Sequence, residues 1–196
     1  MTGIDELARA VEAIASAFEA VGATWAIGGS IASVFHGEPR ATNDIDVVAL
    51  LDENRAKRLV TLLGGHFYAD EAAAVDAVRQ KRSFNVIDTR TFIKIDVFVP
   101  GSGPLGAAQL DRRVMAEVFP DVAMLPVLGA EDTILQKLRW FRLTGGTSDR
   151  QWRDVLSVLR LAPDLDHAYL DRVAAAARLT ALLERARDDA LAEPTS

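Results

Sequence analysis

Residues 24–50 read TWAIGGSIASVFHGEPRATNDIDVVAL, and this stretch decides the fold. Residues 24–27 predict a short buried strand that runs into Gly28-Gly29, where Ser30 is placed to cap a helix over residues 31–35. A break at residues 36–39 follows, and residues 45–50 predict a second strand. This alternation of strand, helix and strand indicates a mixed α/β sheet domain.

Two aspartates lie two positions apart at the start of the second strand. Because alternate strand residues point to the same face, Asp44 and Asp46 project together while Ile45 and Val47 point into the core. Two like charges held side by side repel each other unless a cation lies between them, and Mg²⁺ prefers such oxygen ligands. Taken alone, such a pair is often only a surface pair on an edge strand.

The glycine turn upstream has the chemistry of a phosphate site. Gly28, Gly29 and Ser30 end a strand and open a helix, so they offer backbone N–H groups, a hydroxyl and the positive end of a helix to an anion. In isolation, a Gly-Gly turn before a helix is usually only structural.

A third carboxylate stands in a later strand. Residues 83–88 and 91–99 predict a hairpin, and Ile93, Ile95, Val97 and Val99 make one apolar face of its second strand. Asp96 therefore points to the other face, where it needs a metal or a cation such as Lys94 or an arginine. Three carboxylates and a phosphate-binding turn are together the parts of a two-metal phosphoryl-transfer site.

The rest of the chain divides into two parts. We predict a core over residues 1–125 and a C-terminal helical region over residues 126–196, whose pattern is entirely helical from Pro126 onward. Glu193–Ser196 is expected to be a disordered tail. The further predicted helices are 4–21, 52–63, 71–80, 130–143, 149–161, 166–177 and 179–191, with a further edge strand at 113–118.

Composition excludes several classes of function. The 196 residues are 49% hydrophobic and 26% charged, as in an ordinary globular protein, and the absence of cysteine removes thiol nucleophiles and zinc–thiolate sites. No apolar run approaches a membrane span, and we predict a cytoplasmic protein. The net charge of −6 disfavours extended binding of duplex nucleic acid, although a small site that grips one RNA end or one nucleotide remains compatible with it.

These motifs resemble a known superfamily. Gly28-Gly29-Ser30, then Arg40-x-Thr42-x-Asp44-Ile45-Asp46-Val47, then the strand with Asp96, resemble the DNA polymerase beta-like nucleotidyltransferases over residues 24–100. The Gly-Gly-Ser variant and the helical tail are most similar to the bacterial AbiEii-type branch, which includes toxins of toxin–antitoxin systems. Antibiotic-modifying nucleotidyltransferases have similar cores.

The resemblance implies roles for particular residues. The turn of Gly28, Gly29 and Ser30 would hold the terminal phosphates of an NTP, and Asp44, Asp46 and Asp96 would bind two Mg²⁺ ions. Asp96 would also help to deprotonate the acceptor. From its place in the loop before the aspartate pair, Arg40 is expected to touch the triphosphate.

Two residues of the helical region also enter the prediction. Lys137 lies in a segment that resembles a helical lysine of AbiEii relatives, and its position at the border of an apolar stripe is compatible with either a cleft-facing or a snorkelling side chain. Asp154 is the one residue of its segment that fits the closely spaced aspartates of those relatives. An i,i+4 ion pair with Arg150 is the alternative interpretation of Asp154.

The predicted activity is transfer of NMP from an NTP to a hydroxyl acceptor on RNA, protein or a small molecule. The main rival among enzymes modifies a small molecule, as in antibiotic resistance. The rival of another class is a nucleotide-binding module of the same fold without turnover, such as an antitoxin or a regulator. A toxin would also imply an antitoxin protein as partner.

Overall fold

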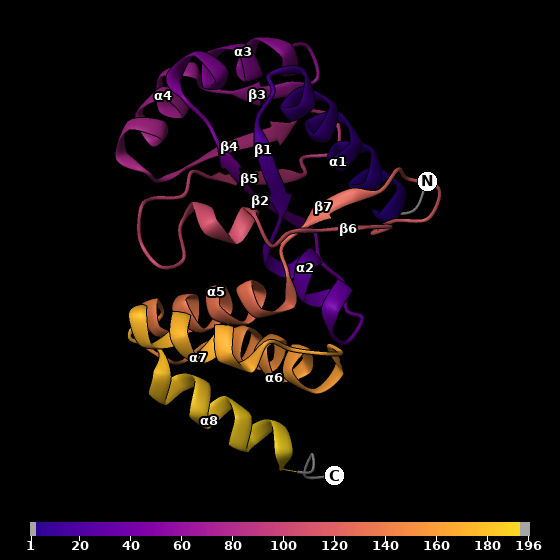
Figure 1. Cartoon of the computed structure of the whole chain (residues 1–196). Helices are drawn as coiled ribbons and strands as arrows, with labels where there is room; N and C mark the ends of the chain where they lie inside the picture. Colours follow the sequence, from indigo (N-terminus) through magenta and orange to yellow (C-terminus); the bar gives the residue numbers. More distant parts are fainter. Residues whose placement is uncertain (1–2, 193–196) are drawn as a thin grey trace.

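A single mixed sheet organises the core. The computed structural model describes residues 3–192, and within them seven strands form one sheet in the order β3-β4-β5-β2-β1-β7-β6 (Figure 1). The strands are β1 (Thr24–Ile27), β2 (Asp44–Leu50), β3 (Phe67–Ala69), β4 (Ser83–Asp88), β5 (Lys94–Phe98), β6 (Val114–Ala116) and β7 (Leu125–Val127).

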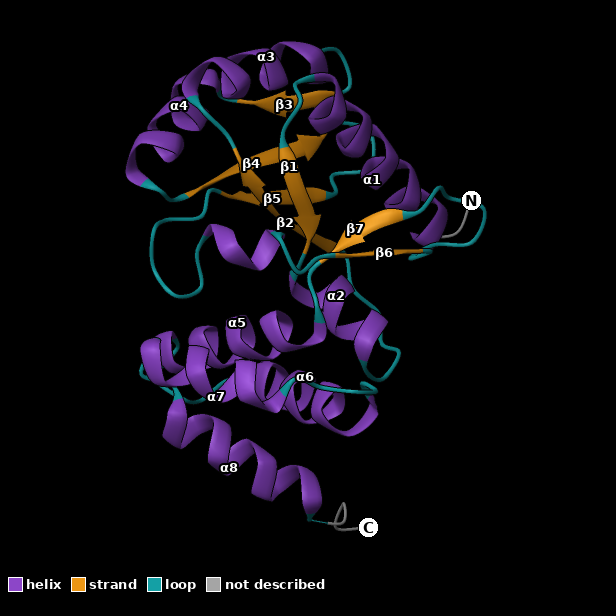
Figure 2. Ribbon diagram, viewed as in Figure 1, coloured by secondary structure: helices purple, strands orange, loops and turns teal. Residues whose placement is uncertain are grey.

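The helices form two groups. In the core they are α1 (Gly3–Ala20), α2 (Gly29–His36), α3 (Glu53–Leu63), α4 (Glu71–Gln80) and the 3₁₀ helix η1 (Ala107–Leu110). The C-terminal group consists of α5 (Ala130–Leu143), α6 (Asp149–Leu161), α7 (His167–Ala176) and α8 (Thr180–Leu191). Helices α1, α3 and α4 cover one side of the sheet, while α5 to α8 gather beyond it with α2 in between (Figure 2).

The two central strands carry the predicted carboxylates. Strand β2 pairs with β1 in antiparallel fashion and with β5 in parallel, so that Asp46 is the register partner of Asp96. Ile45, Val47, Ile95 and Val97 are fully buried in the apolar cluster with α1, α3 and α4. Because side chains alternate along a strand, this burial directs the aspartates to the opposite face of the sheet.

The helical group has an apolar cluster of its own, built mainly from α5, α6, α7 and α8. Its fully buried members include Ile134, Leu138, Val155 and Leu170. The predicted boundary between residues 125 and 126 falls inside β7, which begins at Leu125 and ends at Val127. The division into residues 1–125 and 126–196 stays a prediction.

Most predicted elements are present. Asp52 caps α3 by accepting a hydrogen bond from the N–H of Arg55 at 2.7 Å, and α3 ends at Leu63, just before the glycine pair. The fold is a mixed-sheet α/β core with a C-terminal helical region, as predicted. The predicted disorder of 193–196 lies outside the described residues.

Some local predictions were wrong. The chain is not entirely helical from Pro126 onward, because Pro126 and Val127 belong to β7, which pairs with β1 and β6. A three-residue strand is too short to show a periodic pattern, which also explains why β3 was not predicted. The second strand of the hairpin begins at Lys94 rather than at residue 91, after a turn in which Phe92 has φ of 59°.

Among the helices in the described part of the chain, none is long and apolar enough to cross a membrane.

Candidate nucleotide-binding cleft

A cleft of about 710 Å³ lies between the carboxylate face of the sheet and helices α5 and α6. It brings together residues from the glycine turn, β2, β5 and α5. Seven of the eight predicted site residues line it: Gly28, Gly29, Ser30, Asp44, Asp46, Asp96 and Lys137. Segments distant in sequence therefore meet in one place, as the pattern of motifs predicted.

The glycine turn is bonded to Asp46. The N–H of Gly28 donates to the backbone carbonyl of Asp46 at 2.8 Å, and the N–H of Ser30 donates to the Asp46 side chain. Gly29 has φ of +56°, and a Cβ at this position would overlap the Asp46 carboxylate. Both the backbone conformation and the close approach therefore require glycine at position 29.

Ser30 does not cap α2, contrary to the sequence-based expectation. The helix begins at Gly29, with Gly28 at the cap position and no side-chain cap hydrogen bond. The Ser30 hydroxyl instead accepts hydrogen bonds from Arg40 Nη2 at 2.9 Å and Arg150 Nη2 at 3.1 Å. Its environment is therefore set by two distant arginines rather than by its own helix.

The carboxylates of the cleft influence one another. Burial raises the pKa of Asp46, and the neighbouring charge of Asp96 raises it further. Lys94 Nζ forms an ion pair with Asp96 Oδ2 at 2.8 Å, and this contact raises the pKa of Lys94. The expected cation partner of Asp96 is thus present, and Asp46 is the less compensated of the two carboxylates.

In the described part of the chain, no group of three or more His, Cys, Asp or Glu side chains is gathered in a way that could hold a metal ion. The chemistry of the donor set nevertheless fits Mg²⁺, because Asp46 and Asp96 supply hard carboxylate oxygens from neighbouring strands. Burial and the charge of Asp96 raise the pKa of Asp46 against the opposing effects of Lys137 and the Ser30 N–H, and a bound cation would favour the ionised carboxylate further.

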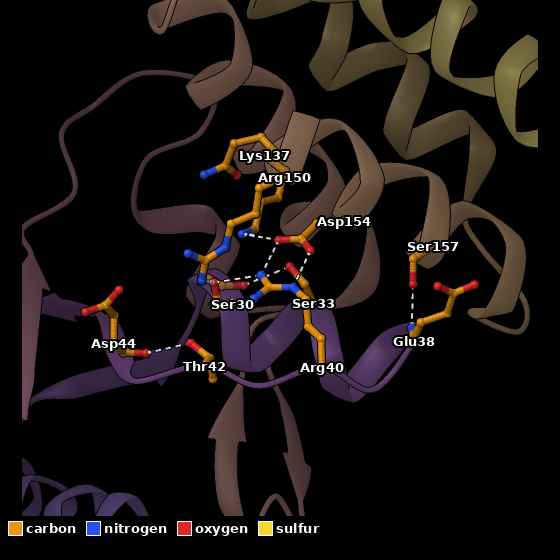
Figure 3. A network of polar contacts seen from close by, with 12 residues as sticks. Ser30, Ser33, Glu38, Arg40, Thr42, Asp44, Lys137, Arg150, Asp154 and Ser157 are labelled. Atoms are coloured by element: carbon orange, nitrogen blue, oxygen red, sulfur yellow. Dashed lines mark hydrogen bonds and ion pairs between the residues drawn. The ribbon is translucent and has the colours of Figure 1, made fainter. Parts of the chain in front are cut away.

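A buried ion network joins the core to the helical region (Figure 3). Asp154 accepts two hydrogen bonds from Arg40, with Nε to Oδ1 at 2.8 Å and Nη2 to Oδ2 at 2.7 Å. Lys137 Nζ donates to the same Asp154 Oδ2 at 2.7 Å. The network fixes α6 to the loop that precedes β2.

The pKa values of the network follow from burial and pairing. Burial lowers the pKa of Lys137 against the opposing effect of Asp154. Burial alone would raise the pKa of Asp154, but the hydrogen bond from Arg40 and the charge of Lys137 outweigh it, and the pKa is lowered.

Both alternative interpretations of these helical residues were wrong. Lys137 is 4% exposed and does not snorkel to solvent, since its ammonium group is paired inside the protein. Asp154 binds Arg40 and Lys137 rather than Arg150, because its side chain points toward the core and away from solvent. A nucleotide-binding role for Arg40 remains a prediction. Its guanidinium is committed to Asp154 and Ser30, and Arg40 is not among the residues that line the cleft.

Several cleft residues were not among the predicted site residues. They include Arg150 beside the glycine turn and a second wall in which Lys81, Arg82, Arg139, Trp140 and Phe98 take part. The Phe98 and Trp140 rings meet edge to face with centroids 6.0 Å apart. No motif marks these residues, because only the packing of α4, β5 and α5 brings them together.

The sheet, the glycine turn at a helix start and the facing carboxylates define a protein of the nucleotidyltransferase class. Over residues 13–195 the sequence matches the family described as nucleotidyl transferase AbiEii toxin of type IV toxin–antitoxin systems, and the chain belongs to this family. The resemblance stated from the motifs is thereby confirmed. No curated protein matches the sequence.

Solved structures agree on the fold. An antigenic nucleotidyltransferase-like protein from Paracoccidioides brasiliensis is similar with a TM-score of 0.59 and 18% identity, over 94% of this chain and 93% of that one. The antibiotic-resistance factor ANT(2'')-Ia is similar with a TM-score of 0.56 and 14% identity, over 95% of this chain and 99% of that one. Both similarities extend through the helical region as well as the sheet.

Proposed function

We propose that this nucleotidyltransferase moves NMP from a Mg²⁺-bound NTP to a hydroxyl acceptor, and that it acts as the toxin of a toxin–antitoxin pair. One observation carries the proposal: the phosphate turn and the register pair Asp46–Asp96 face the same cleft. A phosphate held at the turn would then lie next to the carboxylates that bind Mg²⁺ and deprotonate the acceptor hydroxyl.

The Ser30 hydroxyl is oriented to donate a hydrogen bond. A serine hydroxyl has two lone pairs and one proton, and Arg40 and Arg150 both donate to Ser30 Oγ. With both lone pairs engaged, the proton is the group left to interact with an anion. The start of α2 adds its partial positive charge at the same turn.

Asp44, Asp46 and Asp96 are the residues that would hold Mg²⁺. When bound, the metal would neutralise the triphosphate and lower the pKa of the attacking hydroxyl. Lys94 keeps Asp96 paired with a cation. We assign to Asp96 the role of accepting the proton of the acceptor. Asp46 is additionally held by the N–H of Ser30, so that the phosphate turn and the carboxylate are positioned as one unit.

The second wall of the cleft favours an anionic acceptor. Lys81, Arg82 and Arg139 line it, and none of these three has an acidic partner among the described residues. Trp140 is 42% exposed beside Phe98, and an exposed ring can stack on a base. Such a wall suits an RNA end and would repel a polycationic antibiotic, so RNA is the acceptor class we propose.

The family description supports the toxin role, and with it an antitoxin partner. The competing hypothesis is a binding module that holds NTP without turnover. The pairing of Asp96 with Lys94 would be a permanent structural contact under that hypothesis. The two hypotheses differ in whether any acceptor becomes labelled.

The direct experiment incubates the protein and Mg²⁺ with each α-labelled NTP and with separate pools of RNA, protein and small metabolites. We expect label in the RNA pool, dependent on Mg²⁺. Label in the protein pool or the small-metabolite pool instead would replace RNA as the acceptor class. Binding of NTP with no labelled acceptor in any pool would support the binding module and contradict the proposed function.

A further inference from the structure

A cation from the helical region reaches the glycine turn. Arg150, in the first turn of α6, donates from Nη2 to Ser30 Oγ at 3.1 Å, across 120 positions of sequence. Figure 3 shows its side chain extending toward Ser30 from above the Asp154 network. No motif marks Arg150, and the proposed function gives it no direct contact with the nucleotide.

Arg150 and Arg40 share Ser30 but differ in their remaining partners. Arg40 is held by both oxygens of Asp154, so its charge is largely compensated. Arg150 forms no ion pair with any described carboxylate, and it is exposed and lines the cleft. Since a guanidinium has five N–H donors and only one is engaged with Ser30, the others remain for an anion.

The cleft wall beside Arg150 is also incompletely hydrogen-bonded. Among the described residues, Gln151 Oε1 and Thr133 Oγ1 are buried and have no hydrogen-bond partner, and both residues line the cleft. Buried polar atoms are normally paired, so both atoms have hydrogen-bonding capacity left for a polar ligand in the cleft.

We infer that Arg150 binds the triphosphate of the NTP, together with the Ser30 hydroxyl, and so couples the helical region to nucleotide binding. The planar guanidinium matches phosphate oxygens in a two-pronged geometry. The ligand class is a nucleoside triphosphate, since its terminal phosphates carry the charge that an uncompensated arginine recognises. This inference rests on the proposed function, because it assumes that NTP occupies the glycine turn.

The test compares the affinities of Arg150→Ala, Arg150→Lys and wild type for Mg·ATP, or for whichever NTP wild type prefers, and for the corresponding NMP. Arg150→Ala should weaken NTP binding by roughly 10- to 100-fold and change NMP binding little, since loss of a hydrogen bond to a charged group has this effect. Arg150→Lys should retain part of the NTP affinity because it keeps the positive charge. The rest should be lost because an ammonium group cannot bind a phosphate through two parallel hydrogen bonds.

The matched control is Arg153→Ala, which removes the same charge from the same helix at an exposed position that does not line the cleft. Thermal unfolding of each variant checks that the fold is kept. If wild type binds NTP and Arg150→Ala binds it equally well, the inference is wrong while the proposed function stands. An equal loss of affinity in Arg153→Ala would also overturn it, since the effect would then be one of net charge. If wild type binds no NTP at all, the proposed function and the inference both fail.

Discussion

Asp46 and Asp96 are register partners on the adjacent parallel strands β2 and β5, so their side chains emerge together on the cleft face of the sheet. The arrangement is costly for the protein alone, because burial and the proximity of Asp96 both raise the pKa of Asp46. Lys94 compensates Asp96, and the charge of Lys137 and the N–H of Ser30 partly compensate Asp46. Such a pair is what a cation-dependent phosphoryl-transfer site requires.

Replacing Gly29 should damage both the fold and nucleotide binding. In Gly29→Ala, the positive φ and the overlap with the Asp46 carboxylate should lower the unfolding free energy by about 1 to 3 kcal/mol and displace Asp46. Urea unfolding and NTP calorimetry measure the two effects. Gly103→Ala is the control, since its Cβ would meet nothing within 4 Å. Unchanged NTP affinity in Gly29→Ala would show that the turn is merely structural.

The ion network predicts a stability defect that a second substitution relieves. Asp154→Asn leaves Arg40 and the buried Lys137 without a counter-charge, and we expect a loss of about 3 to 5 kcal/mol in urea unfolding. Adding Lys137→Met should recover much of this loss by removing the buried charge. Asp149→Asn, at an exposed position of α6, should change little. A loss below about 1 kcal/mol in Asp154→Asn would contradict the network's stabilising role.

The sequence predicted those cleft residues whose positions follow from local patterns, and it missed those brought together by contacts between distant positions of the chain. Asp44, Asp46 and Asp96 were placed on the cleft face because strand alternation is local and the intervening residues are apolar. The contact of Arg150 with Ser30 spans 120 positions and leaves no local pattern. The same limit applies to Ser30, whose position before a helix suggested a cap, whereas tertiary contacts determine its partners.

A buried carboxyl group away from the cleft should make stability depend on pH. Burial raises the pKa of Asp132 from 3.8 to about 6, although the Tyr169 hydroxyl donates to it and Arg112 lies nearby. Because the folded-state pKa is the higher one, the contribution of Asp132 to stability is full below about pH 4 and is lost as the pH rises to about 6.

Asp132→Asn tests this dependence because an amide does not titrate. Relative to wild type, the variant's unfolding free energy should increase on the order of 2 to 3 kcal/mol between pH 4 and pH 7. Denaturant titrations at several pH values measure the difference. The exposed Asp76→Asn should show no such trend. If the difference in unfolding free energy between Asp132→Asn and wild type is constant with pH, the pKa of Asp132 is not raised in the folded protein.

The second wall of the cleft predicts that loss of its exposed ring weakens acceptor binding alone. Trp140→Ala should raise KM for an RNA acceptor about tenfold through lost stacking and leave NTP affinity unchanged. Leu143→Ala removes another exposed apolar side chain of α5 and serves as the control. Equal KM values for wild type and Trp140→Ala would place the acceptor elsewhere.

The central claim is that Asp46 and Asp96 perform metal-dependent transfer, and the most direct test measures transfer and Mg·NTP binding in the same set of proteins. Asp96→Asn should reduce transfer by about 100-fold or more while keeping much of the NTP affinity, whereas Asp46→Asn should weaken both. The exposed Asp76→Asn should match wild type in both measurements. Full transfer by Asp96→Asn would contradict the account.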